Sequence, residues 1–537
     1  MLRYFYIYAF SCFYGKAIKN ERIGIMGFFA NADLPVLLAF LLYLAVMLGI
    51  GFYFTNKSKK MSDYFLAGRG LNSWVTAMSA QASDMSGWLL MGLPGAAYAT
   101  GMGNYWIAIG LAIGTILNWA FVAKPLRRFT EVCGDSITIP QYLQNRFKTD
   151  SPVVRMVCAV VIFIFFLVYT TSAFVSGGKL FQVVFNIDPT NETYTKAAVI
   201  ISALIIIIYT FLGGFNAVAW TDFVQGMLMV ITIVALPIAL ISNTPGFSSE
   251  MLNSIPKIVS EGGDTGGYMS MFSGMRPVDI ISNLAWALGY FGMPHILVRF
   301  MAIKDTKSVK KSAIIAVVWV LISLTAAVLI GIVGRAYLDS QGVVLSSSEM
   351  ELIFITTVKK LFPSFLGGIF LSAVLASIMS TADSQLLVTA SAVVNDFYTI
   401  IVKKESSEKK LMWISRISVI IISVIACILA LNPNDSIMGI VSNAWAGFGA
   451  AFGPAIVLSL YWKRLTLKGT VAGIIGGAGT VVIWEYILPN IVSAADSLYS
   501  IIPGVIVSVI LTVCVSLADK APSKEVTDMF ELAKSEE

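Results

Sequence analysis

Two acidic residues and a row of hydroxyl side chains lie inside long apolar segments of the sequence. Asp84 stands in SAQASDMSGWLLMGLPGA, and Asp383 stands in SAVLASIMSTADSQLLVTASA. Hydroxyls of the second segment recur at helical spacings of three and four, so most share one face: Ser377, Ser380, Thr381 and Ser384. A membrane-buried carboxylate is costly unless it faces a cation or water, and clustered oxygens suit hard cations. The pattern therefore predicts a site for a small monovalent cation.

Each of these features also has a structural explanation, and the residues alone leave it open. Asp84 also fits a carboxylate that caps a half-helix or pairs with a buried base. Hydroxyls in membrane helices often bond to the carbonyl four residues earlier. A third acid, Asp222 in AWTDFVQG, forms a capping-box pattern with Gln225 as readily as a cation ligand.

Two apolar segments carry helix-breaking residues at their centres. The first contains Asp84, the pair Ser86-Gly87 and a further expected break at Gly92 to Gly95. The other reads NLAWALGYFGMPHILVRF, with Gly289, Gly292 and Pro294 close together. Irregular backbone inside a membrane is tolerated only where protein buries it or where it lines a cavity. Both segments therefore indicate discontinuous helices beside a binding site.

The broken segments are the second and seventh predicted spans, five apart along the chain. This spacing predicts inverted repeats of five helices, near residues 74–242 and 277–462, with the substrate between the two breaks. Trp286 and Tyr290 are spaced i and i+4 at the second break. Aromatic residues at that spacing are more often core packing, but their position at the break makes them candidate solute contacts. We expect His295 to bond backbone groups that the break frees.

The surrounding elements are predicted to be membrane helices. Of the 537 residues, 57% are hydrophobic and only 13% are charged, which argues against a soluble enzyme. A helix needs about 20 apolar residues to cross a bilayer. By this criterion we predict thirteen spans, near 33–54, 74–99, 104–123, 153–178, 196–215, 222–242, 277–298, 313–334, 364–395, 413–431, 437–462, 468–488 and 500–518.

The Lys and Arg residues, Arg299 included, concentrate in alternate loops, and such loops face the cytoplasm. The N-terminus is therefore predicted outside and the C-terminus inside, in the cell membrane. We divide the chain into an N-terminal extension (1–32), a transporter domain (33–519) and a polar tail (520–537) that we expect to be mobile. The extension is either translated or a mis-assigned start upstream of Met26.

Several other function classes find little support. The net charge of +6 falls in short clusters, which disfavours nucleic acid as a partner. Five scattered cysteines and one histidine predict no disulfide framework, no zinc site and no hydrolytic triad, so we expect no enzyme. A cation channel is an alternative, but filter-like loops such as TVGYG are absent from the sequence.

Five motifs resemble the sodium/solute symporter family, and within it the bacterial sodium/proline symporters. They are ASDMSGWLLMGLPGA, TFLGGFNAVAWTDFVQG, ALGYFGMPHILVRFMA, IMSTADSQLL and NAWAGFGAAFGPAIVLSLYWKR. The resemblance extends from about Leu34 to Pro522. It implies an all-α membrane protein with thirteen helices, a five-plus-five inverted-repeat transporter fold and sodium-coupled uptake of L-proline by alternating access.

The resemblance also implies roles for individual residues. For sodium it implies the main-chain carbonyls of Ala82 and Met85, a carbonyl of Ser377, and the hydroxyls of Ser380 and Thr381, with Asp84 important for sodium dependence. For proline it implies Ser86, Gly87, Trp88, Tyr169, Trp286, Tyr290 and Pro294. A second sodium site would use Asp222, Ser380, Asp383 and Ser384.

Two residues depart from the family pattern. Met293 replaces the Gln of many proline carriers, so another small solute (a different amino acid, pantothenate, a sugar or an acid) is the alternative substrate. Asp383 stands where several relatives have Ser, so it is a second-site ligand, a protonated acid or a member of another pair. Sodium is the expected co-transported ion, with no organic cofactor; the oligomeric state is open.

Overall fold

A computed structural model of the chain describes residues 32–55, 61–212, 214–258, 267–402, 407–433, 435–491 and 498–535. Residues 1–31 of the predicted extension, including Met26, lie outside these ranges. In the described residues the chain is helical throughout, and its one β-type contact is an isolated parallel bridge between Leu71 and Ile303. The all-α expectation is confirmed.

The helices of the first half and their bounds are α2 (Leu34–Thr55), α3 (Met61–Leu66), η1 (Ala67–Arg69), α4 (Ser73–Asp84), η2 (Trp88–Gly92), α5 (Leu93–Thr100), η3 (Gly101–Asn104), α6 (Tyr105–Asn118), η4 (Trp119–Ala123), α7 (Lys124–Val132), α8 (Ile139–Arg146), α9 (Val153–Val184), α10 (Glu192–Leu212), α11 (Phe215–Asn243) and α12 (Ser249–Ser254).

The helices of the second half are α13 (Pro277–Leu284), η5 (Ala285–Phe291), α14 (Pro294–Ala302), α15 (Lys307–Ser340), η6 (Met350–Leu352), α16 (Ile353–Leu361), α17 (Ser364–Ser391), η7 (Ala392–Tyr398), α18 (Thr399–Val402), α19 (Glu408–Ala430), α20 (Ile437–Tyr461), α21 (Leu467–Tyr486), η8 (Leu488–Asn490), α22 (Ile501–Ala518) and α23 (Lys524–Lys534).

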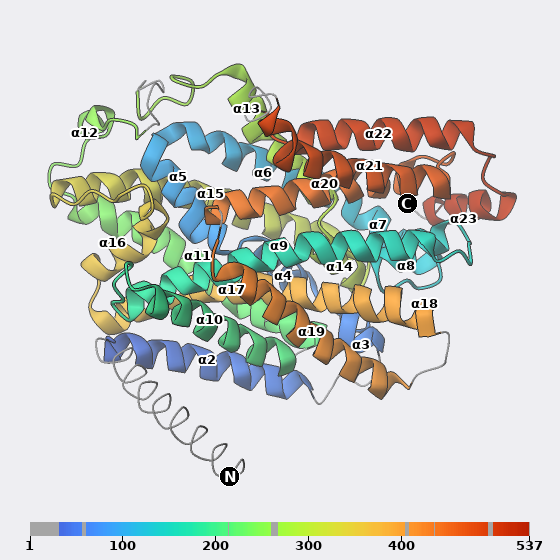
Figure 1. Cartoon of the computed structure of the whole chain (residues 1–537), viewed down its shortest axis with the longest axis horizontal. Helices are drawn as coiled ribbons and strands as arrows, with labels where there is room; N and C mark the ends of the chain where they lie inside the picture. The colour runs from blue at the N-terminus through green and yellow to red at the C-terminus, as the bar shows by residue number, and fades with distance from the viewer. Residues whose placement is uncertain are drawn as a thin grey trace, which may run out of the picture.

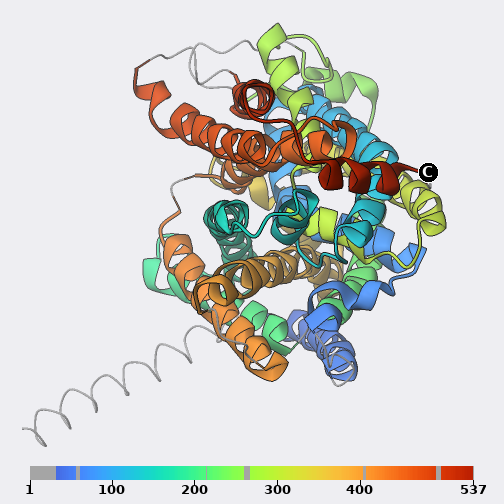
Figure 2. The same ribbon diagram turned by 90° about the vertical axis from the view of Figure 1, so that its right-hand side faces the viewer.

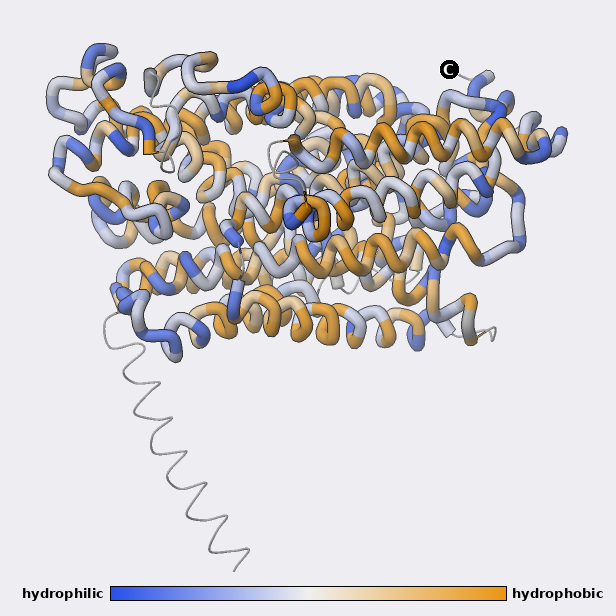
Figure 3. Tube along the Cα trace, turned by 45° about the horizontal axis from the view of Figure 1, so that its top comes forward, coloured by the Kyte–Doolittle hydropathy of each residue, from blue (hydrophilic) through white to orange (hydrophobic). Residues whose placement is uncertain are grey.

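The long helices run side by side as a bundle, with α2 at one side and α22 at the other (Figure 1). Figure 2 shows the bundle from one end. Hydrophobic residues follow the helix bodies, and hydrophilic residues gather at the two ends of the bundle (Figure 3). On α2, for example, Leu38, Leu41 and Leu42 are each at least half exposed. Such outward apolar faces suit contact with lipid.

The predicted count of thirteen spans is not confirmed. Within the described residues, eleven helices are long and apolar enough to cross a membrane. The difference lies at the interrupted segments. The predicted span 277–298 is divided among α13, η5 and α14, each too short to cross alone, and the predicted span 74–99 is divided at Asp84, so that its second part continues into the next long helix.

The polar tail was expected to be mobile, and this expectation is wrong for residues 524–534. They form helix α23, which packs on α7 and α8. Phe530 is buried, and the guanidinium of Arg146 lies 4.9 Å from its ring. Lys463 Nζ lies 2.6 Å from Glu531 Oε1, and this bond lowers the pKa of Glu531. An apolar stripe of one residue every three or four therefore anchors the tail.

Candidate functional site

The first predicted break is present immediately after Asp84. Helix α4 begins at an Asn72 cap, whose side chain accepts hydrogen bonds from the backbone of Trp74 and Val75. It ends at Asp84, because Met85 has the non-helical angles φ −90° and ψ 82°. The helix resumes at η2 in a wide π-turn. The further break expected at Gly92 to Gly95 is wrong: there η2 passes directly into α5, since the π-turn absorbs the irregularity.

The second break lies between η5 and α14, at Gly292 and Met293. Two glycines allow η5 to approach α20 closely. A Cβ on Gly289 would lie 1.9 Å from Trp445 Nε1, and a Cβ on Gly292 would lie 2.2 Å from the carbonyl oxygen of Phe448. Both contacts are too short for any side chain. Close packing against α20 therefore explains why glycines occupy these positions.

Asp84 connects the two broken helices. The hydroxyl of Tyr290, on η5, donates a 2.6 Å hydrogen bond to Asp84 Oδ2. The main-chain carbonyl of Asp84 accepts a 3.0 Å bond from Trp88 Nε1 and a 3.4 Å bond from the Tyr169 hydroxyl. Asp84 is fully buried, and its second carboxylate oxygen, Oδ1, has no hydrogen-bond partner. That oxygen can accept a further bond or face a cation.

The oxygen atoms assigned to sodium lie where α4 meets α17. Ser380 Oγ donates to the carbonyl of Ala82 at 2.7 Å and lies 3.3 Å from the carbonyl of Ser377. The next residue, Thr381, is fully buried, and its hydroxyl has no partner. Met85 directly follows the end of α4. The structure thus gathers all five residues around the first break, where carbonyl and hydroxyl oxygens are available as ligand atoms for a cation.

Aromatic rings cover this break. Trp286 lies between Trp88 and Trp445, at centroid distances of 6.4 and 6.2 Å, and stacks on Tyr499 at 5.5 Å. Tyr290 meets Trp445 edge to face at 5.0 Å. A polar recess beside Trp286 is lined by Arg276, Asp279 and Asn283 among others. Trp286 therefore belongs both to this recess and to the aromatic cluster.

Sequence reasoning missed Trp445 and Tyr499, two members of this aromatic cluster. Trp445 lies within the motif NAWAGFG, but no feature of that motif distinguishes it from a core residue. Its indole donates to the carbonyl of Trp286 at 2.8 Å, which fixes η5 against α20. Tyr499 comes just before α22 and has no local signal.

The remaining solute candidates line the two breaks. Gly87 lies so near α9 that a Cβ there would be 2.4 Å from Ser176 Oγ. Ser86 is buried beside it, with its hydroxyl 3.4 Å from the Trp88 backbone nitrogen. Pro294 begins α14 and lies away from this group, in the wall of a separate cavity. The structure therefore places Pro294 at the start of α14, directly after the second break.

Comparison with known proteins decides the family of this chain. The model of the sodium:solute symporter family matches residues 64–477. The chain belongs to the sodium:solute symporter family. The osmoregulated proline transporter OpuE of Bacillus subtilis (strain 168) is 44% identical over 93% of this chain and 98% of its own length. The sodium/proline symporter of Staphylococcus aureus (strain JH9) is 41% identical over 92% and 94%, respectively.

A solved structure supports the fold. The substrate-bound, outward-open sodium-coupled sialic acid symporter aligns with a TM-score of 0.72 and 19% identity, covering 91% of this chain and 99% of that one. At this identity the likeness concerns the fold alone. The protein is a multi-pass membrane transporter with the inverted-repeat fold, and it is not an enzyme.

In this symporter, two of the four residues predicted as a second sodium site bond an arginine. Asp222 on α11 accepts a 3.0 Å bond from Arg299 Nη2, and Ser384 accepts a 2.5 Å bond from the same nitrogen. Arg299, expected in a cytoplasmic loop, is instead fully buried on α14. That expectation is wrong because an arginine directly after an apolar run looks like a loop charge unless its partner is known.

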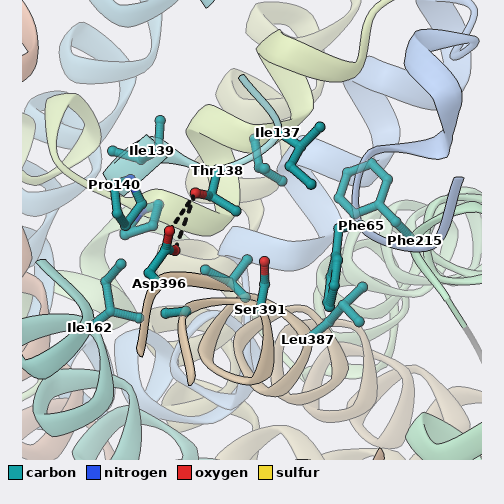
Figure 4. A pocket seen from close by; sticks show the side chains of 14 residues that line it. Phe65, Ile137, Thr138, Ile139, Pro140, Ile162, Phe215, Leu387, Ser391 and Asp396 are labelled. Atoms are coloured by element: carbon teal, nitrogen blue, oxygen red, sulfur yellow. Dashed lines mark hydrogen bonds between the residues drawn. The ribbon is translucent and has the colours of Figure 1, made fainter. Parts of the chain in front are cut away.

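Pro294 lines a small cavity of the symporter. Its other wall includes Phe65, Thr138, Ser391 and Asp396 (Figure 4). Thr138 donates to Asp396 at 3.1 Å, the dashed contact in Figure 4. Arg155 Nε donates to Asp396 Oδ1 at 2.8 Å. This fully buried carboxylate joins α8, α9 and η7 and closes the cavity on that side.

Replacing Asp396 with Asn is expected to destabilise the symporter. The amide can still bond Thr138, but Arg155 loses its charged partner, at a cost of about 2 kcal/mol. Thermal unfolding of the purified protein in detergent measures the change. The matched control is Glu525→Gln, which removes the exposed 3.6 Å pair with Lys148 and should have almost no effect. An equal melting temperature for Asp396→Asn and the native protein would contradict the role of this pair.

Proposed function

We propose that this symporter couples the inward movement of sodium to the uptake of L-proline across the cell membrane by alternating access. The observation that carries the proposal is the position of Asp84, which joins the sodium-ligand junction to the aromatic cluster of the second broken helix. The names of the 41–44% identical relatives support proline as the solute. The sodium site and the solute site would then be connected through Asp84.

Sodium would bind the oxygens of Ala82, Met85, Ser377, Ser380 and Thr381. It would hold the end of α4 against α17, and so keep Asp84 and Tyr290 in place for the solute. By linkage, sodium then raises solute affinity by the same factor by which the solute raises sodium affinity. The electrical driving force adds about 2.3 kcal/mol per charge for each 100 mV.

Proline would bind between the two breaks. Its carboxylate would favour the positive end of a half-helix, which a break exposes. Its ammonium group would favour the unpaired Oδ1 of Asp84, and its ring would contact Trp286. After rearrangement of the helices, the cavity beyond Pro294 would provide the route to the cytoplasm.

The proposed orientation places the N-terminus outside and the tail in the cytoplasm. The docking of α23 near Lys148 and Lys463, two residues of the predicted inner loops, supports it. Cysteines introduced at exposed positions near Asp188 and in α23, labelled from one side of intact cells, test it. We expect a membrane-impermeant reagent to reach the Asp188 loop alone; labelling of the α23 position from outside would contradict the orientation.

Uptake of labelled proline into proteoliposomes with an imposed sodium gradient tests the function. Equal uptake with a potassium gradient would refute sodium coupling. A competition panel of other amino acids, pantothenate, sugars and sialic acid tests the identity of the solute. This test is needed because Met293 replaces the Gln of many proline carriers. Stronger competition by one of these than by unlabelled proline would identify a different substrate.

Replacing Trp286 with Ala is expected to raise the half-saturation concentration for proline about 10-fold or more. The indole stacks on Tyr499 and lies tilted against Trp88 and Trp445, and its loss removes apolar contact of about 1.5–3 kcal/mol. Uptake kinetics at saturating sodium measure the effect. Trp74, exposed at the start of α4, is the matched control, and Trp74→Ala should leave the kinetics unchanged. Equal half-saturation for both variants would place the solute elsewhere.

A further inference from the structure

A buried arginine is hydrogen-bonded to two of the residues predicted to form a second sodium site. Arg299 on α14 donates from Nε to Ser79 Oγ at 3.1 Å, and from Nη1 to the carbonyl of His295 at 2.6 Å. Nη2 donates to both Asp222 Oδ2 and Ser384 Oγ, at 3.0 and 2.5 Å. Helices α4, α11, α14 and α17 thus meet at one guanidinium.

Two of the four residues predicted for the second sodium site, Asp222 and Ser384, hold the guanidinium. Asp222 Oδ2 already accepts from Arg299 and from Ser79, the latter at 2.7 Å. Ser384 Oγ is engaged by Arg299 and lies 2.8 Å from the carbonyl of Ser380. Arginine stays protonated under all physiological conditions. A sodium ion bound at these atoms would have to displace a charged group that is held on all three of its nitrogens.

The cluster contains two acids and one base. Asp383 accepts a 3.1 Å bond from Ser384 at Oδ1, and its Oδ2 has no partner. Asp222 and Asp383 are both fully buried, and so is Arg299. Removing the guanidinium alone would leave two buried carboxylates with no cation between them, a state that strongly favours recruitment of another cation.

We propose that Arg299 is a tethered cation that takes the place of a second sodium ion, so that this symporter moves one sodium with each solute molecule. The inference rests on the proposed function, because it concerns the same coupled transport. It assigns Asp222 and Ser384 to holding Arg299 and leaves the junction of α4 and α17 as the sodium site. Arg299 acts as a positioning residue that sets the cation stoichiometry.

The experiment counts sodium ions in two ways for the native protein and for Arg299→Met. Equilibrium binding of labelled sodium to the purified protein needs no solute, and the flux ratio of labelled sodium to labelled proline in proteoliposomes measures transport. For the native protein we expect about one sodium per chain and per proline. The Hill coefficient for sodium should then be close to 1, because it cannot exceed the number of sites. For Arg299→Met we expect about two sodium ions, with a Hill coefficient that rises toward 2.

Two further variants complete the design. Arg146→Met removes another fully buried arginine, whose surroundings are Phe129, Phe147 and Phe530 and not acids, and should still bind one sodium. The double variant Asp222→Asn, Arg299→Met has the same net charge in the cluster as the native protein. It should also bind one sodium, and should recover sodium-dependent uptake if Arg299→Met alone has lost it.

Each result bears on the inference. Two sodium ions in the native protein would overturn it, and so would one sodium in a folded Arg299→Met protein. If Arg299→Met neither binds nor transports, the double variant decides: recovery supports the charge replacement, and failure to recover refutes it. Failure of the proposed function gives a different result. Native protein that binds one sodium but shows no sodium-stimulated proline uptake would refute proline as the solute. It would leave the role of Arg299 as a tethered cation intact.

Discussion

The variant Asp84→Asn is expected to lose sodium-driven uptake, with sodium affinity reduced about 100-fold. A carboxylate about 6 Å from a monovalent cation stabilises it by about 3 kcal/mol at an effective dielectric constant of about 20. Asp84 is fully buried at the end of α4, two residues after Ala82 and just before Met85. The loss of its charge therefore affects the proposed ion without any change in the oxygen ligands themselves.

The substitution changes charge more than shape. The Asn side-chain oxygen can still accept the 2.6 Å bond from Tyr290, so the connection between the two broken helices is retained. The sodium activation curve of proline uptake and the binding of labelled sodium are the measurements. Asp188→Asn, in an exposed turn, is the matched control and should leave both unchanged. An activation curve for Asp84→Asn that overlays that of the native protein would refute the assigned role.

The variant Thr381→Val is expected to weaken sodium binding about 10-fold or more while the protein remains as stable as before. The Thr381 hydroxyl is buried and makes no hydrogen bond, so its replacement by a methyl group removes no contact from the folded protein. If the oxygen is a sodium ligand, its loss removes an ion–dipole contact of about 1.5–3 kcal/mol. Function and stability should therefore respond in different ways.

A second threonine on the same helix provides the control. Thr389 is also buried on α17, but its hydroxyl donates to the carbonyl of Gln385 at 2.7 Å. Thr389→Val should lower thermal stability by about 1 kcal/mol and leave sodium affinity unchanged. Sodium half-saturation and unfolding in detergent distinguish the two variants. The reverse pattern, with Thr381→Val less stable and normal in sodium affinity, would make Thr381 a structural residue.

Local sequence patterns predicted much of the architecture. Hydropathy located the long helices, and Gly and Pro located both interruptions, because these signals depend on residues near one another in the chain. The break at Asp84 and the break before Pro294 lie where the sequence placed them. The same signals could not count the spans, since they do not tell whether a broken segment continues into its neighbour.

Long-range packing decided how the site is arranged. Tyr290 and Asp84 are 206 positions apart, and Ser380 and Ala82 are 298 apart, yet each pair is joined by a hydrogen bond. No sequence periodicity relates residues at such distances. Without the family resemblance, the sequence therefore could not predict which residues the oxygens of α17 contact. The docking of α23 and the burial of Arg299 also depend on contacts between residues that are far apart in the chain.

The sequence by itself determined that this chain spans a membrane, where its helices are interrupted and to which family it belongs. Only the tertiary structure showed that Arg299 is held between acids and not in a loop, and that Asp84 meets Tyr290. The physical reason is that helix formation and insertion depend on the local solvent preference of about 20 residues. The partner of a buried charge depends on which helices pack together.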